Sequence, residues 1–166
     1  MNIVLIGMRG AGKTTVAKLL SKKLKKPYIE MDDLVVEKAG METSDIVKNH
    51  GWEYFRDLES KVVKEVSRKN DCVISCGGGV VTRLENIKAL KKNGKLFWLQ
   101  ANIDTLIKRV GNDTNRPSLT GKTSPREDME EVLKKRLLLY QNSADEIIDT
   151  QAYTAQDVAK AIMKKL

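Results

Sequence analysis

Short runs of apolar, often β-branched residues alternate along the chain with longer segments in which apolar residues recur at helical spacing. The first run, residues 2–6, is bounded by Gly7 and predicts a buried strand. The next segment places Val16, Leu20 and Leu24 on one side of a helix. The whole pattern predicts five strands, at 2–6, 28–31, 72–75, 95–99 and 146–149. It predicts helices at 13–25, 32–38, 43–49, 53–69, 84–92, 104–110, 125–142 and 154–166.

This order of elements indicates the fold class. Apolar strands separated mostly by helices are typical of a parallel sheet covered on both faces. We therefore expect an α/β protein with three α/β/α layers around a five-stranded parallel sheet. Asn102 and Thr154 precede two of the helices as caps, and Thr43 or Ser44 is expected to cap a third. The 166 residues predict a single domain spanning 1–166.

Residues 111–124 form the longest segment without a hydrophobic period. They are rich in Gly, Asn, Thr, Ser and Pro, which predicts a loop. Loops of this length in a compact domain often close over a binding site. We therefore expect a mobile lid here.

Composition narrows the ligand class. The chain has 30 Lys and Arg against 22 Asp and Glu, a formal net charge of +8, which favours anionic ligands, although many lysines are expected to be solvated helix surface. No apolar run approaches the roughly 20 residues of a membrane span, and no secretory signal is expected. Two cysteines and His50 make a structural zinc site improbable. A reducing, cytoplasmic location fits this cysteine usage.

Residues 7–14 carry the clearest chemical motif. They read G-M-R-G-A-G-K-T and match G-x-x-x-x-G-K-[ST] between a predicted strand and a predicted helix. In such a loop the backbone N–H groups bind phosphate oxygens, Lys13 reaches the β- and γ-phosphates and the Thr14 hydroxyl faces Mg²⁺. The motif therefore predicts a P-loop NTPase fold that binds ATP and Mg²⁺, but it does not name the reaction. The expected nucleotide-binding residues here are Gly10, Ala11, Gly12, Lys13, Thr14 and Thr15.

Carboxylates follow the second predicted strand and not the third. The third strand ends at Ser75, whereas Glu30 and Asp32 come directly after the second. The carboxyl ends of parallel strands meet at one crevice, so both carboxylates are expected near the phosphate loop. There they could contact Mg²⁺ waters or an acceptor hydroxyl. The alternative is that Asp32 only caps the next helix.

Further candidates gather after the third strand and on the helices. Arg56 and Glu59 share a helix face, a spacing that is also typical of a surface salt bridge. Three consecutive residues without a Cβ follow the third strand and let backbone approach a small ligand, unless they form only a flexible turn. They are Gly77, Gly78 and Gly79. Arg109, Arg116 and Arg136 lie near the long loop, where each alone could be surface charge.

Together these segments resemble the shikimate kinase family, P-loop kinases of the nucleoside-monophosphate-kinase type. The resemblance runs from Gly7 to Asp149. The matching segments are GMRGAGKTT, EMDD, GWEYFRDLE, ISCGGGVV, R-x₆-RP from Arg109 to Pro117, and K-R-x₃-Y from Lys135 to Tyr140. Only the first would be shared with a generic kinase. The resemblance implies phosphorylation of the 3-hydroxyl of shikimate by MgATP.

On the acceptor side, the resemblance implies that Asp32 holds the shikimate hydroxyls. Arg56 and Arg136 match the arginines that bind the shikimate carboxylate. The backbone of 77–79 lines the same pocket, and Glu59 orients Arg56.

On the nucleotide side, the resemblance implies that Arg116 is the lid arginine over the transferring phosphate and that Arg109 stacks on adenine. Thr14 and Ser75 match positions around Mg²⁺. With Glu30 and Asp32 they complete the predicted metal environment.

The sequence departs from the family pattern at four points. Glu30 stands where Asp is usual, so a contact with a Mg²⁺ water there needs a reoriented side chain. Leu138 replaces a common Pro, and Val47 stands where many relatives have Phe lining the pocket. Residues 151–154 contain no arginine for the adenine.

Two other function classes compete with this hypothesis. One is another small-molecule kinase of the same fold, such as a gluconate or nucleoside-monophosphate kinase. The other is a basic ATP-dependent nucleic-acid-binding protein, but the few aromatic residues are not interleaved with basic ones as a stacking surface requires. We therefore expect shikimate and ATP as ligands, no nucleic acid, no membrane and a monomer.

Overall fold

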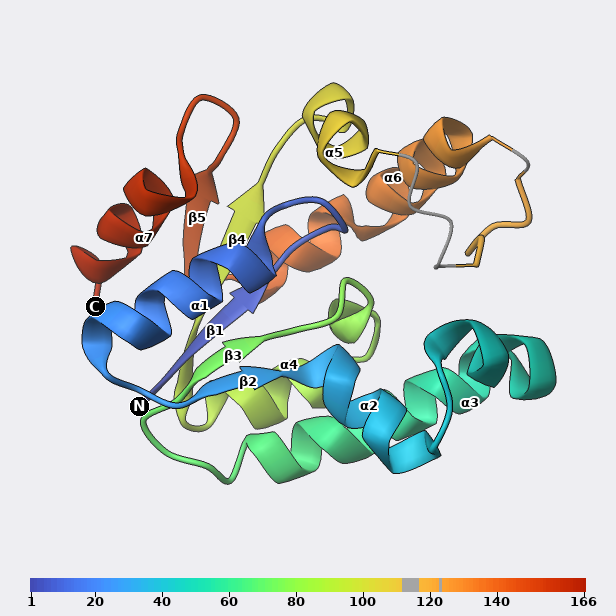
Figure 1. Cartoon of the computed structure of the whole chain (residues 1–166), viewed down its shortest axis with the longest axis horizontal. Helices are drawn as coiled ribbons and strands as arrows, with labels where there is room; N and C mark the ends of the chain where they lie inside the picture. Colours follow the sequence, from blue (N-terminus) through green and yellow to red (C-terminus); the bar gives the residue numbers. More distant parts are fainter. Residues whose placement is uncertain (112–116, 123) are drawn as a thin grey trace.

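The computed structural model describes residues 1–111, 117–122 and 124–166 and contains one five-stranded sheet (Figure 1). The strand order is β2-β3-β1-β4-β5, and every neighbouring pair is parallel. This confirms the predicted parallel sheet. The strands are β1 (Asn2–Ile6), β2 (Tyr28–Glu30), β3 (Val73–Ser75), β4 (Gly94–Gln100) and β5 (Glu146–Asp149).

Helices cover both faces of this sheet, so the predicted three-layer arrangement is also confirmed (Figure 1). On one face lie α1 (Lys13–Leu24) and α7 (Ala155–Met163). On the other lie the second half of α3 (Thr43–Val66), α4 (Leu84–Lys91) and α6 (Pro125–Ser143). The remaining helices are α2 (Met31–Ala39), the 3₁₀ turn η1 (Val80–Thr82) and α5 (Ile103–Val110).

The central strand β1 explains where the phosphate loop lies. All five of its residues are buried, because β1 pairs with β3 on one side and β4 on the other and has helices on both faces. Val4, for example, faces Ile74 across one pair and Leu96 across the other. The chain leaves this central strand at Gly7. The phosphate loop therefore begins at the carboxyl end of the strands, near the middle of the sheet.

The helix termini partly follow the sequence. The Asn102 side chain accepts a hydrogen bond from the Thr105 N–H at 2.9 Å, and Thr154 forms a reciprocal capping box with Asp157. The expected cap at Thr43 or Ser44 is wrong. Glu42 precedes the helix there and makes no side-chain capping bond.

Two local features differ from the predicted elements. The helices expected at 43–49 and 53–69 form one element, α3, which is interrupted where Gly51 adopts φ 83° and ψ 172°. Such a positive φ suits glycine, so the predicted break is present as a kink. The turn η1 was not predicted, because three residues carry no helical period. Among the described residues, no helix combines the length and apolar character of a membrane span.

Candidate active site

The phosphate loop joins β1 to α1 and closes around the Lys13 ammonium. Its Nζ donates hydrogen bonds to the carbonyl oxygens of Gly7 and Met8, both at 2.9 Å. Gly10 has φ +83°, and a Cβ there would lie 2.7 Å from the carbonyl oxygen of Leu106. The backbone therefore turns where a side chain would not fit. The Ala11 N–H donates to the Met8 carbonyl at 3.1 Å, so the N–H groups at the start of α1 are the ones best placed for phosphate oxygens.

A cavity opens beside this loop, and we call it the loop cavity. The Thr14 hydroxyl donates to Glu30 Oε2 at 2.7 Å, and the Tyr28 hydroxyl donates to the same oxygen at 2.5 Å. Burial and the adjacent Glu30 carboxylate raise the pKa of Tyr28, so its phenol stays protonated and donates. Residues lining the loop cavity include Lys13, Thr14, Glu30, Asp32, Ser75 and Arg109.

The chemistry of these side chains fits Mg²⁺. Hydroxyl and carboxylate oxygens are the ligands that Mg²⁺ prefers, and the ion commonly keeps waters and phosphate oxygens as further ligands. Ser75 Oγ is buried and has no hydrogen-bond partner in the described part of the chain, so an oxygen there is available to a ligand shell. No group of three His, Cys, Asp or Glu side chains that could hold a metal occurs among the described residues.

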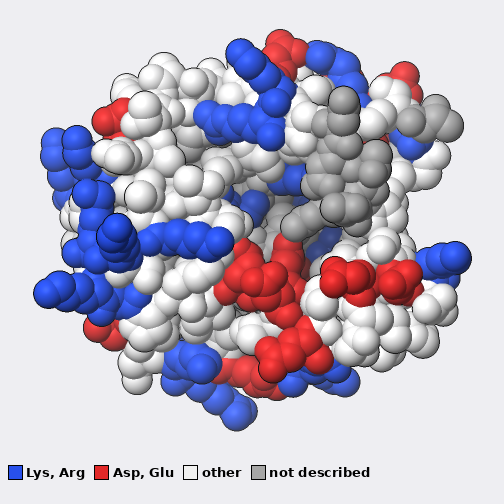
Figure 2. Space-filling view, viewed as in Figure 1, with Lys and Arg blue, Asp and Glu red and all other residues white. Residues whose placement is uncertain are grey.

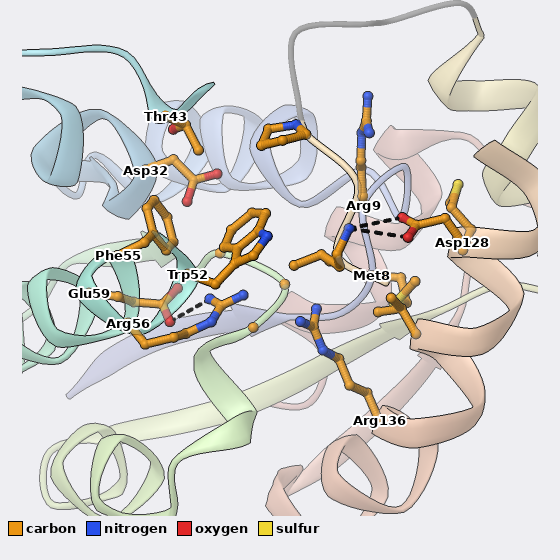
Figure 3. Close-up of a pocket in the computed structure, with 17 residues that line it drawn as sticks. Met8, Arg9, Asp32, Thr43, Trp52, Phe55, Arg56, Glu59, Asp128 and Arg136 are labelled. Atoms are coloured by element: carbon orange, nitrogen blue, oxygen red, sulfur yellow. Dashed lines mark hydrogen bonds and ion pairs between the residues drawn. The ribbon is translucent and has the colours of Figure 1, made fainter. Parts of the chain in front are cut away.

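A second cavity, the triplet cavity, lies against residues 77–79 between α3 and α6 (Figure 3). A Cβ on Gly77 would lie 2.7 Å from Asp32 Oδ1 and 2.8 Å from Glu59 Oε2. A Cβ on Gly79 would overlap the Arg56 guanidinium. The missing side chains thus make room for charged groups, which excludes the interpretation of 77–79 as only a flexible turn.

Arg56 and Glu59 form a buried ion pair on α3. Arg56 Nη1 lies 2.8 Å from Glu59 Oε1, and the side chains are 11% and 1% exposed. Burial raises the pKa of the Glu59 carboxyl, although Arg56 acts in the opposite direction. The Arg56 guanidinium also lies 5.4 Å from the Trp52 ring and 5.3 Å from the Phe55 ring. The alternative of a surface salt bridge is wrong for this pair.

Arg136 reaches the same cavity from α6. It is buried, and Figure 3 shows its guanidinium and that of Arg56 directed into the cavity from opposite sides. One turn further along α6, the fully buried Tyr140 donates its hydroxyl to the Gly78 carbonyl at 2.6 Å and stacks on Trp98. Burial raises the pKa of Tyr140 to about 12. The structure therefore places two cations opposite one another and ties the triplet to α6.

The two cavities meet, because Arg9, Asp32 and Gly78 line both. Asp32 does not cap α2: it lies inside that helix, and Glu30 occupies the capping position. Figure 2 shows the hollow on this face, with acidic side chains along one rim and basic side chains within it. A group bound between the two arginines can thus present a hydroxyl to the phosphate loop at Asp32.

Comparison with known proteins decides the family. A family model described as shikimate kinase matches residues 9–166. This chain belongs to the shikimate kinase family. A shikimate kinase from Thermodesulfovibrio yellowstonii is 43% identical over 164 residues, which span 99% of this chain and 94% of that protein. "Shikimate kinase 2" of Photorhabdus laumondii is 43% identical over 150 residues, which span 89% of this chain and 85% of that protein.

Solved structures of the family have the same fold. Shikimate kinase from Acinetobacter baumannii in complex with shikimate superimposes with a TM-score of 0.94 at 32% identity, covering 99% of this chain and 91% of that one. The enzyme from Aquifex aeolicus gives 0.84 at 29% identity, covering 99% and 95%. The expected membership in the shikimate kinase family and the expected fold class are both confirmed.

Arg109, at the end of α5, also lines the loop cavity. Its guanidinium donates to the Thr150 hydroxyl at 2.9 Å and to the Thr150 carbonyl at 2.7 Å. A further cavity runs from the phosphate loop past Arg109 to Tyr153, whose side chain is exposed. Residues 151–154 contain no arginine, and this exposed aromatic ring lines the same cavity as Arg109.

Two of the positions that depart from the family pattern do not line the triplet cavity. Val47 packs against the core and does not line the triplet cavity, whereas Trp52 and Phe55 supply aromatic walls there. Leu138, at the position of the usual Pro, is exposed within α6. Arg116 lies outside the described residues, as do residues 112–115 and 123 of the expected lid.

Sequence reasoning missed several residues of the site. Arg9 occupies a variable position of the phosphate-loop motif, so the motif gave no reason to single it out. Trp52 and Thr43 line the triplet cavity, and Tyr140 ties it to α6. The Tyr at the end of the K-R-x₃-Y segment was a usable signal for this last role.

Proposed function

We propose that this protein is a shikimate kinase that transfers the γ-phosphate of ATP to the 3-hydroxyl of shikimate, giving shikimate 3-phosphate and ADP. This reaction belongs to the biosynthesis of aromatic amino acids. The observation that carries the proposal is the pair of buried cations, Arg56 and Arg136, opposite one another in a cavity that joins the phosphate loop at Asp32. The relative from A. baumannii, solved in complex with shikimate, supports the same substrate.

The two arginines provide recognition of a carboxylate. Each guanidinium presents a planar set of donors that matches a carboxylate, which a lysine cannot copy. Glu59 fixes Arg56 through their 2.8 Å ion pair and so orients its remaining donors. The acceptor is therefore held before its hydroxyl meets the nucleotide, and this positioning lowers the barrier to transfer.

Transfer takes place at the junction of the cavities. Asp32 orients the 3-hydroxyl and accepts its proton as the bond to phosphorus forms. Lys13 stabilises the charge that spreads over the equatorial oxygens of the transferred group. In this proposal the backbone N–H groups of residues 10–15 hold the β- and γ-phosphates, and Arg109 with Tyr153 encloses the adenine.

Thr14, Ser75, Glu30 and Asp32 are the residues that would hold Mg²⁺ or its waters. Bound there with ATP, the ion would neutralise phosphate charge. A lid at 111–124, with Arg116 over the transferring phosphate, also belongs to the proposal and rests on the sequence. One domain over 1–166, a monomeric state and a cytoplasmic location stay predictions.

Release of ADP tests the function directly. With MgATP present, addition of shikimate should start ADP formation, and mass spectrometry should find one phosphate added to shikimate. Gluconate, nucleoside monophosphates and single-stranded DNA are the matched additions for the competing function classes. Stimulation by one of these and not by shikimate would replace the proposal with the corresponding class.

A further inference from the structure

Tyr28 makes a contact that the proposed reaction does not use. Tyr28 and Glu30 stand two residues apart on β2, so their side chains lie on the same face of the strand. The Tyr28 hydroxyl donates to Glu30 Oε2 at 2.5 Å, and the Thr14 hydroxyl donates to the same oxygen at 2.7 Å. The half-buried ring of Tyr28 also lies 5.7 Å from Lys18 Nζ of α1. One carboxylate oxygen thus links β2 to the start of α1.

The direction of the Thr14 hydrogen bond has a chemical consequence. A threonine hydroxyl has one proton and two lone pairs. Because the proton points to Glu30, the lone pairs remain for a cation in the loop cavity. Within the described part of the chain, both hydrogen bonds received by Glu30 end on Oε2, so Oε1 can accept from a water near the cation.

The length of Glu30 explains why a second donor is needed. Glutamate has one more rotatable bond than the aspartate usual in the family, and fixing a long side chain costs conformational entropy. The Tyr28 hydroxyl holds the carboxylate at its far end, where an aspartate at residue 30 would end one methylene short. The length of the Glu30 side chain therefore suits the position of the Tyr28 hydroxyl.

We propose that Tyr28 is a positioning residue of the metal–nucleotide site, which holds Glu30 so that the Thr14 hydroxyl keeps its lone pairs directed at the cation. This inference rests on the proposed function only in taking a magnesium nucleotide as the ligand. Acceptor recognition at the triplet cavity does not depend on it.

Binding of ADP, measured by calorimetry with and without Mg²⁺, tests the proposal without any turnover. Tyr28→Phe should lower the affinity for ADP in Mg²⁺ by about 3- to 10-fold, the range for one lost hydrogen bond. The affinity for ADP in a chelator should stay within about two-fold of the unmodified protein, a change below roughly 0.4 kcal/mol. Tyr54→Phe is the control, because it removes the hydroxyl of an exposed tyrosine on α3.

A double-mutant cycle separates positioning from packing. In the Glu30→Asp background, Tyr28→Phe should have no further effect on the Mg²⁺ dependence, because the shorter carboxylate does not reach the phenol. Glu30→Gln provides a second variant and should show the same Mg²⁺-specific loss.

Three outcomes would overturn the proposal. They are equal loss of ADP affinity with and without Mg²⁺, an unchanged Mg²⁺ dependence in Tyr28→Phe, and additive effects of Tyr28→Phe and Glu30→Asp. The proposed function fails separately, through absence of shikimate-dependent ADP release from a protein that still shows the Mg²⁺ effect.

Discussion

The two cavities that meet at Asp32 are built in different ways. The loop cavity takes many of its groups from one continuous segment, residues 9–15, whose shape follows from its glycines and from the burial of β1. The triplet cavity takes its groups from the phosphate loop, α2, α3, the loop after β3, residues 117–119 and α6. In the proposed function, phosphate binding is therefore encoded locally, whereas the acceptor site exists only once the whole fold has formed.

The largest expected effect tests the loop cavity, whose groups come mostly from one continuous segment. Lys13→Met should lower kcat by about 10³-fold or more, because the ammonium acts on charge that develops in the transition state. Steady-state ADP release gives kcat, and thermal unfolding should still show a folded protein, because Lys13 is not part of the apolar core, although its hydrogen bonds to Gly7 and Met8 are lost. Retention of more than about a tenth of kcat, a change of less than ~1.4 kcal/mol, would contradict this role.

The junction should give the next largest effect. Asp32→Asn keeps the size of the side chain but removes its charge, and it should lower kcat by about 10²-fold, the lower range for a general base. Glu30→Asp restores the usual family residue and should change kcat at saturating Mg²⁺ by far less. If the order of the two effects is reversed, Glu30 and not Asp32 serves the acceptor.

A substitution that preserves charge tests the triplet cavity, whose groups come from separate elements. Arg56→Lys should raise the KM for shikimate by about 10-fold and leave the KM for ATP nearly unchanged, since lysine loses the planar donor set. The matched control is Arg83→Lys, which alters an arginine paired with the exposed carboxylates of Glu53 and Asp57. Equal effects of the two variants on the KM for shikimate would show that burial of the Arg56 pair has no functional role.

Removing one hydroxyl should weaken the tie between α6 and the triplet. Tyr140→Phe loses the hydrogen bond to the Gly78 carbonyl and should lower the free energy of unfolding by about 1 kcal/mol. The KM for shikimate should rise a few-fold because Gly78 shifts, and nucleotide affinity should change by less, although Gly78 also lines the loop cavity. A stability loss without any change in this KM would restrict Tyr140 to packing.

The smallest effect concerns the segment that follows the expected lid. Burial pushes the pKa of Asp128 up, but hydrogen bonds from Thr120, Ser118 and the Leu119 N–H outweigh it, so the pKa lies below its ordinary value. A lowered pKa means that Asp128 stabilises the fold above its ordinary pKa of about 3.9, and that this contribution is lost as pH falls further. Asp128→Asn should therefore destabilise the protein at pH 7 and progressively less towards pH 3 in denaturant titrations. A pH-independent loss would contradict the titration of Asp128.

The local half of the site was accessible from the sequence. The strand at 2–6, the phosphate loop and the helix behind it follow from hydrophobic period and glycine spacing, which act over a few residues. The same holds for the parallel sheet, because the alternation of strands and helices leaves few other topologies.

The triplet cavity could not be predicted from residue spacing alone. Arg56 and Glu59 have the spacing of a surface pair, and only tertiary packing shows that they are buried and directed at residues 77–79. The resemblance to shikimate kinases supplied their roles, but it did not supply Arg9, Trp52 or the hydroxyl of Tyr28. Those contacts depend on which elements lie side by side, which no local pattern records.

The crowding at Gly79 bears on resistance to inhibitors. Its backbone has ordinary negative φ, so the restriction to glycine comes from the Arg56 guanidinium that occupies the space of a side chain. An inhibitor packed against this backbone contacts a position where any larger residue would displace that guanidinium. A substitution at Gly79 that weakened inhibitor binding would thus also displace Arg56 and weaken binding of the acceptor. Resistance substitutions should therefore arise at other residues that line the cavity.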